Sequence, residues 1–127
     1  MSQAPVISIV DDDASVRVAT SRLVRSLGHV AYTFASADEF LRSPQASETC
    51  CLIADVQMPG MSGVELQSCL LAEGRRLPII FVTAFPDENV RMRALDAGAV
   101  CFLTKPFDVP TLIRHLDAAL AQHGNEA

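Results

Sequence analysis

Apolar residues gather in five short runs along the chain, each five or six residues long. The runs are rich in β-branched and aromatic side chains, which favour extended, pleated backbone. They occupy residues 6–10, 30–34, 51–55, 78–83 and 100–105. We expect each run to form a β-strand.

Between these runs, apolar residues recur at helical spacing. The first such segment places Val16, Ala19, Leu23 and Leu27 on one face and ends at Gly28, a natural helix C-cap. Further helices are predicted over 37–42, after Gly63 and before Gly74, from Pro86 to Ala97, and after Asp108. Because strand and helix alternate five times, we expect an α/β fold, a doubly wound parallel sheet covered by helices on both faces.

Length and composition narrow the class of protein. The 127 residues, half of them hydrophobic, predict a single domain over 1–127, with a core of about residues 5–122 and a short polar tail over 123–127. The net charge of −5 argues against a direct nucleic-acid surface. No basic leader or membrane-length apolar run is present, which favours a cytoplasmic protein. The four cysteines lack CxxC spacing and are interpreted as small buried hydrophobes.

Polar groups stand at the carboxyl ends of four of the five predicted strands. The first run leads into the aspartates 11–13, the third ends in Asp55, the fourth in Thr83 and the fifth in Lys105. Taken singly, each has a plainer explanation as a helix cap, a turn residue or a solvated side chain. Open parallel sheets bind ligands beyond the carboxyl ends of their strands. The four positions together therefore predict one site at that edge.

The predicted site combines carboxylates with a lysine and a hydroxyl. Crowded carboxylates repel one another, and a divalent cation relieves that repulsion. An all-oxygen donor set suits Mg²⁺, with Mn²⁺ as a substitute, better than zinc or iron. A carboxylate beside such a metal can act as a nucleophile toward phosphorus, while a lysine and a hydroxyl neutralise the phosphoryl oxygens. The residues thus favour phosphoryl-group chemistry.

Four motifs of the chain resemble those of the receiver domain of two-component response regulators. These are "IVDDD", "DVQMPGMSG", "FVTAF" and "FLTKPF", which occur in the family's order and span essentially the whole chain. The wording "DVQMPGMSGVEL" with "ALDAGAVCFLTKPF" is most similar to receivers that precede a helix-turn-helix DNA-binding output domain. The resemblance implies a flavodoxin-like fold with strand order 2-1-3-4-5.

The resemblance also implies roles for the acidic residues. Asp55 matches the phosphoryl acceptor of the family. Asp12, Asp55 and the backbone carbonyl of Gln57 match the protein ligands of Mg²⁺, and Asp11 acts on the metal mainly through water. Asp13 occupies the next acidic position and is expected to cap the first helix.

The remaining motif residues match the parts that bind the phosphoryl group and respond to it. Thr83 matches the switch hydroxyl, and Lys105 matches the lysine that pairs with the phosphoryl oxygens. Phe102 stands where the family has an aromatic switch residue. The Lys105–Pro106 bond matches a position that is cis in the family, and the cis form is tolerable before proline.

The implied function is a phosphorylation-activated signalling switch rather than an enzyme, with a histidine kinase as its partner. The surface formed by the segments 86–97 and 100–105 and the helix after Asp108 is expected to change on phosphorylation and to support a homodimer or control an output domain. The similarity to transcription regulators favours a C-terminal DNA-binding domain that is missing from this chain.

Three alternatives remain at this level. A Mg²⁺-dependent phosphohydrolase that forms an aspartyl phosphate would carry a second aspartate two residues after the nucleophile, where this chain has Gln57. A flavodoxin-like cofactor binder would need a phosphate loop of Ser, Thr and Gly, and the run "DDDAS" would repel that phosphate. A phosphorylation-independent pseudo-receiver is disfavoured by the intact set of Asp55, Thr83 and Lys105.

Overall fold

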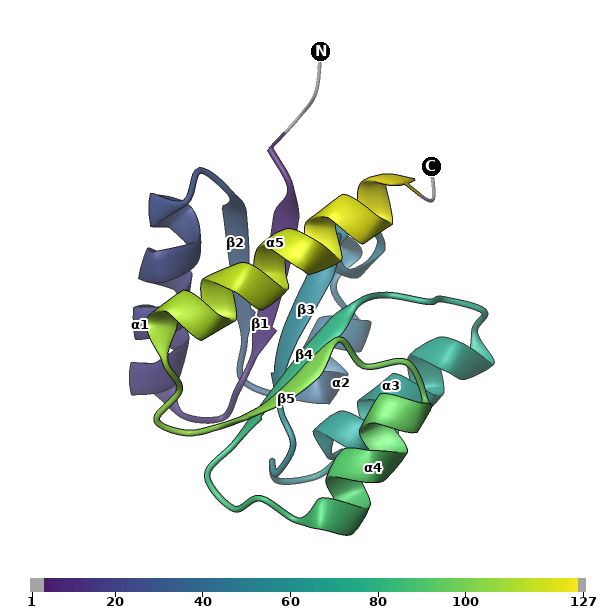
Figure 1. The fold of residues 1–127 in the computed structure, drawn as a ribbon. Helices are drawn as coiled ribbons and strands as arrows, with labels where there is room; N and C mark the ends of the chain where they lie inside the picture. The colour runs from purple at the N-terminus through teal and green to yellow at the C-terminus, as the bar shows by residue number, and fades with distance from the viewer. Residues whose placement is uncertain (1–3, 126–127) are drawn as a thin grey trace.

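The computed structural model describes residues 4–125 and contains one five-stranded parallel sheet (Figure 1). The strands lie in the order β2-β1-β3-β4-β5, which confirms the predicted fold and topology. Their bounds are β1 (Val6–Val10), β2 (Val30–Phe34), β3 (Cys51–Asp55), β4 (Ile79–Thr83) and β5 (Cys101–Thr104). The predicted strands over 78–83 and 100–105 are thus shortened by one or two residues at their ends.

Five α-helices connect and cover the strands, with α1 and α5 on one face and α2, α3 and α4 on the other (Figure 1). Their bounds are α1 (Ala14–Ser26), α2 (Ala37–Leu41), α3 (Gly63–Ala72), α4 (Glu88–Asp96) and α5 (Val109–Asn125). A short 3₁₀ helix, η1 (Pro44–Glu48), was not predicted. Helix α4 begins two residues later than expected because Asp87 caps it, accepting hydrogen bonds from the N–H groups of Asn89 and Val90.

The sheet separates two hydrophobic layers. Side chains alternate between them, so that Leu52 faces α2, α3 and α4 while Ile53 faces α1 and α5. The central strands β3 and β4 are buried at all five positions, which explains their uninterrupted apolar runs. Of the predicted polar tail, residues 126 and 127 lie outside the described residues, and α5 continues to Asn125.

Helix α1 faces the sheet differently from the sequence prediction. Its buried residues are Thr20, Ser21 and Val24, whereas Ala19 is exposed and the other three predicted positions are half-buried. The Ser21 hydroxyl donates a hydrogen bond to the carbonyl of Val18 at 3.0 Å, so this polar side chain is satisfied within its own helix. The buried face therefore need not coincide with the most apolar face.

The cysteine prediction is only partly correct. Cys51 and Cys101 are buried, but Cys50 and Cys69 are half-buried. Burial raises the pKa of Cys51 to about 12 and that of Cys101 to about 11, so these two thiols stay protonated and unreactive at neutral pH. No helix within residues 4–125 has the length and apolar character needed to cross a membrane.

Candidate functional site

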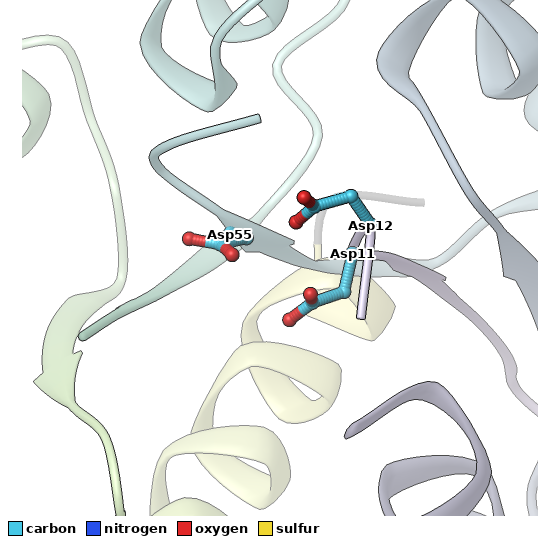
Figure 2. Close-up of side chains that lie close together, drawn as sticks. All are labelled: Asp11, Asp12 and Asp55. Carbon is cyan, nitrogen blue, oxygen red and sulfur yellow. The ribbon is translucent and has the colours of Figure 1, made fainter. Parts of the chain in front are cut away.

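Three aspartates meet at the carboxyl edge of the sheet (Figure 2). Asp11 follows β1 directly, Asp12 comes next, and Asp55 is the last residue of β3, the strand paired with β1. One carboxylate oxygen from each residue lies within 4.8 Å of the others. Asp11 is 1% exposed and Asp55 6%, whereas Asp12 faces solvent. The topology therefore brings together the acidic residues that the sequence predicted.

Asp11 is held from several directions. Its N–H donates to the carbonyl of Phe34 at 3.1 Å, which ties the end of β1 to the end of β2. Its Oδ1 accepts from the N–H of Asp13 at 2.9 Å. Asp13 in turn caps α1 by accepting hydrogen bonds from Ser15 and Val16, as expected. The loop between β1 and α1 is thus a closely hydrogen-bonded turn that presents the acidic pair.

Lys105, which follows β5, contacts two of the three aspartates. Its Nζ lies 2.9 Å from Asp11 Oδ2 and 3.1 Å from Asp55 Oδ2. The Lys105 N–H donates to the carbonyl of Thr83 at 2.8 Å, and the Lys105–Pro106 peptide bond is cis. A lysine at the end of an apolar strand is explained by these contacts, because its ammonium is the counter-charge for two buried carboxylates.

One ammonium does not neutralise the whole cluster. Burial raises the pKa of Asp55, and the nearby charge of Asp11 adds to that rise, while hydrogen bonds from Lys105 and Gln57 oppose it. Burial alone would lower the pKa of Lys105, but its hydrogen bonds to Asp11 and Asp55 outweigh burial and raise it. Lys105 therefore stays charged, and the site keeps an excess of negative charge.

The loop after Asp55 is shaped around a glycine that the sequence analysis treated only as a helix boundary. The Gly63 N–H donates to the carbonyl of Val56 at 2.9 Å, which folds the start of α3 back against β3. A Cβ atom at Gly63 would clash with the carbonyl oxygen of Asp55 and lie 3.1 Å from the ring of Phe81. The "MSG" stretch was the available signal, since only glycine permits this approach.

Gln57 and Thr83 flank the acidic cluster. The Gln57 N–H donates to Asp55 Oδ1 at 3.1 Å, while the residue itself is exposed. Thr83 is fully buried at the end of β4, the strand next to β3, and its Oγ1 accepts a hydrogen bond from the Phe85 N–H at 3.1 Å. Both residues therefore lie next to the cluster on the strand ends or loops that frame it.

Phe102 lies in β5, apart from the acidic residues. It is half-buried in β5, and its ring centroid is 6.3 Å from that of Phe81 with the planes tilted by 47°. It pairs in register with Phe81 in β4, two residues before Thr83. Phe102 does not contact the cluster directly, but it packs against the strand that carries Thr83.

The donor set fits a hard divalent cation. The three clustered side chains offer only carboxylate oxygens. The pKa of Asp55 is raised mainly by burial and further by the charge of Asp11, and a cation would relieve the repulsion between these carboxylates. Mg²⁺ binds one or two carboxylates and keeps several waters, which suits one exposed and two buried aspartates. The residues present are therefore compatible with a Mg²⁺ site.

Comparisons with known proteins identify the class to which this fold and site belong. A family model described as "Response regulator receiver domain" matches residues 7–117. The response regulator protein TodT of Pseudomonas putida is 45% identical over 118 residues, which cover 93% of this chain and 52% of TodT. The transcriptional regulatory protein FixJ of Azorhizobium caulinodans is 32% identical over 126 residues, covering 99% of this chain and 60% of FixJ.

Solved structures agree with the sequence comparisons. The structure of the response regulator StyR superimposes with a TM-score of 0.90 at 40% identity, covering 98% of this chain and 63% of StyR. The chain belongs to the response regulator receiver domain family, which is a signalling family and not a classical enzyme family. The match to TodT covers nearly all of this chain but only about half the length of TodT.

Proposed function

We propose that this chain is a phosphorylation-controlled switch in which Asp55 accepts a phosphoryl group from a histidine kinase. The observation that supports this most directly is that Asp11, Asp12 and Asp55 lie together at one edge of the sheet, where the Lys105 ammonium contacts Asp11 and Asp55. In the transfer, a carboxylate oxygen of Asp55 bonds to phosphorus as the bond from phosphorus to the kinase histidine nitrogen breaks. The imidazole leaves with the bonding electron pair.

Mg²⁺ is the proposed cofactor, and Mn²⁺ would serve in its place. The side chains of Asp12 and Asp55 and the backbone carbonyl of Gln57 would hold it directly, and Asp11 would act through water. When bound, the metal neutralises charge on the transferring phosphoryl group. The tight carboxylate cluster, in which the charge of Asp11 acts on Asp55, supports a cation at this place.

Lys105 and Thr83 are proposed to donate hydrogen bonds to the oxygens of the new phosphoryl group. Lys105 already donates to Asp55 at 3.1 Å, so a small shift brings its ammonium to an added phosphoryl group. Each charge-assisted hydrogen bond is worth about 1.5–3 kcal/mol, or roughly 3–6 kcal/mol for both. Moving a population from 1:99 to 99:1 takes about 5.5 kcal/mol, so the upper end of this range suffices.

The same shift offers a route from the site to the surface. Drawing Thr83 toward the phosphoryl group frees space behind it, and Phe102 on the adjacent strand rotates inward to fill that space. The face built from α4, β5 and α5 then changes shape. Exposed Met92, Asp96, Arg114 and Asp117 lie on this face, a mixed-charge set that suits a symmetric dimer.

The proposed setting is the cytoplasm, with control of transcription as the output. FixJ is named a transcriptional regulatory protein, and the chain matches 60% of its length. This supports a DNA-binding domain, here proposed to be of the helix-turn-helix type, as the element that the receiver controls. Direct contact of the receiver with nucleic acid is not proposed, since its net charge is −5.

The acceptor assignment is tested by intact-mass measurement after incubation with acetyl phosphate and Mg²⁺. Wild type should gain one phosphoryl group, and Asp55→Asn should gain none, because an amide is not a nucleophile. Asp13→Asn is the matched control: its amide oxygen still caps α1, so phosphorylation should persist. An adduct on Asp55→Asn as large as on wild type would refute the assignment. Failure of wild type to form any adduct would favour a pseudo-receiver.

The dimer is tested by light scattering coupled to size exclusion. With beryllofluoride and Mg²⁺, the protein should pass from monomer to dimer, and Met92→Glu should prevent this by placing a charge on the proposed face. A protein that stays monomeric at high concentration with beryllofluoride bound would refute the dimer and leave the acceptor assignment intact.

A further inference from the structure

Arg17 makes a hydrogen bond to the acidic loop that none of the proposed site roles uses. It lies in the first half of α1, where it is half-buried, and its Nη1 donates to the backbone carbonyl oxygen of Asp11 at 2.6 Å. The contact joins α1 to the residue that directly follows β1. A charged donor makes such a bond shorter and stronger than a neutral one does.

The carbonyl of Asp11 belongs to the peptide unit that also contains the nitrogen of Asp12. Because a peptide unit is planar, a donor that holds this oxygen in place also holds the nitrogen of Asp12. The direction of the N–Cα bond of Asp12 is thereby fixed. Asp11 itself is held at its N–H by Phe34 and at its carboxylate by Asp13 and Lys105. For Asp12, the exposed member of the cluster, orientation depends far more on the peptide unit that precedes it.

We propose that Arg17 is a positioning residue that holds the Asp11–Asp12 peptide unit so that the Asp12 carboxylate faces Asp11 and Asp55. The inference rests on the metal site of the proposed function. It adds a residue on α1 to that site, one that supports a ligand and does not itself bind the cation. Partners of metal ligands typically change metal affinity by roughly 10–100-fold when they are removed.

A purely electrostatic role for Arg17 would have the opposite sign. A guanidinium near a cation site repels the cation, so removing it would tighten Mg²⁺ binding. A positioning role instead predicts weaker binding after removal. Salt separates the two effects, because at 1 M ionic strength the Debye length is only about 3 Å and charge repulsion is largely screened. Loss of positioning persists under those conditions.

Arg25 offers a matched control within the same helix. It also lies in α1, and its Nη2 also donates to a backbone carbonyl, that of Ala31, at 3.2 Å. Ala31 lies in β2, three residues before the end of the strand, and is not part of the acidic cluster. Replacing Arg25 thus removes a similar bond and the same charge without touching the Asp11–Asp12 peptide unit.

The experiment titrates Mg²⁺ alone into the unphosphorylated protein by calorimetry, at about 0.1 M and about 1 M KCl. Arg17→Met should weaken Mg²⁺ binding roughly tenfold at both salt concentrations, whereas Arg25→Met should not change it. Arg17→Lys should recover part of the loss, since an ammonium N–H can donate to the same carbonyl. Tighter or unchanged binding in Arg17→Met would overturn the proposal.

A second measurement uses the metal-free protein. Amide hydrogen exchange at Asp13, whose N–H donates to Asp11 Oδ1, should speed up in Arg17→Met and not in Arg25→Met. Asp12→Ala distinguishes a failure of the positioning role from a failure of the metal site. If Asp12→Ala loses Mg²⁺ and Arg17→Met does not, the positioning role alone is wrong. If wild type binds no Mg²⁺ or Asp12→Ala binds it normally, the metal site and the positioning role both fail.

Discussion

The carboxyl edge of the sheet has two sides that are packed very differently. On the acceptor side, which comprises β1, β3 and the aspartates that follow them, four of five residues of β1 and all five of β3 are buried. On the switch side, which comprises α4 and β5, only Cys101 is fully buried in β5 and only Ala94 in α4. The three aspartates thus lie on the more deeply buried side, and the surface proposed to report phosphorylation lies on the more exposed one.

Helix α4 is joined to α3 by a buried hydrogen bond. The side-chain amide of Gln67 in α3 donates to the carbonyl of Ala94 at 3.0 Å, near the C-terminal end of α4. Segments with few buried contacts open at lower free energy than well-packed strands. The difference in burial suggests that the two sides have different roles. Extensive packing aligns the acidic residues, and sparse packing permits α4 and β5 to change on phosphorylation.

The largest predicted effect comes from Lys105, which connects the two sides. Lys105→Met should lower the free energy of unfolding at pH 7 by about 3 kcal/mol, because the buried carboxylates of Asp11 and Asp55 lose their ammonium partner. Urea denaturation without Mg²⁺ measures this. The ion pair of Arg91 with Glu88 is exposed, so Arg91→Met should cost less than about 0.5 kcal/mol. Equal losses in the two variants would contradict the prediction.

The next effect concerns the backbone of the acceptor side. Gly63→Ala should lower the free energy of unfolding by about 1–3 kcal/mol, because the new Cβ clashes with the carbonyl of Asp55 in a fully packed strand. On the switch side, Met92 is 53% exposed, and Met92→Ala should change stability by at most about 0.5 kcal/mol. Thermal and urea unfolding of both variants give the comparison. A larger loss in Met92→Ala would mean that α4 is packed more tightly than its burial indicates.

A smaller effect follows from the pKa of Asp55. Burial raises this pKa in the folded state, so ionised Asp55 opposes folding above it, and stability is regained as the pH falls through it. Asp55→Asn should therefore be more stable than wild type near pH 7, by a margin that shrinks as the pH falls. Urea denaturation from pH 7 downward measures the difference, and a margin independent of pH would contradict the assigned cause.

Asp108 provides a control of opposite sign for the same series. Hydrogen bonds from the Thr111 side chain and N–H lower the pKa of this exposed carboxyl. Its contribution to stability is present above the ordinary aspartate pKa and is lost as the pH falls through the lowered value. Asp108→Asn should thus be less stable than wild type near neutral pH and approach it in acid. The same direction of change in both variants would show that the pH series reports something other than these two groups.

Several features were accessible from the sequence for clear physical reasons. The central strands are buried on both faces, so they read as unbroken apolar runs and were found to within two residues. The helix ends were visible where a glycine or a capping aspartate stands. The short η1 helix has too few residues to show a period, and so it escaped prediction.

The site was predicted less completely than the fold. Arg17 and Gly63 did not stand out, because their importance lies in a backbone carbonyl contacted across a loop and in the absence of a Cβ beside another strand. Ala19 was expected on the buried face of α1, but Thr20 and Ser21 take that place, and the Ser21 hydroxyl is satisfied by a carbonyl of its own helix. Such contacts depend on distances between segments, which residue spacing does not encode.

The sequence alone determined the alternation of strands and helices and the chemical groups at the strand ends, because both follow from local periodicity and from the direction of parallel strands. Only the tertiary structure decided how those groups interact. It placed one ammonium between two buried carboxylates, left Asp12 in solvent, and buried one side of the sheet edge more deeply than the other. Burial and hydrogen-bond geometry are properties of the packed chain, since each arises from residues that are distant in sequence.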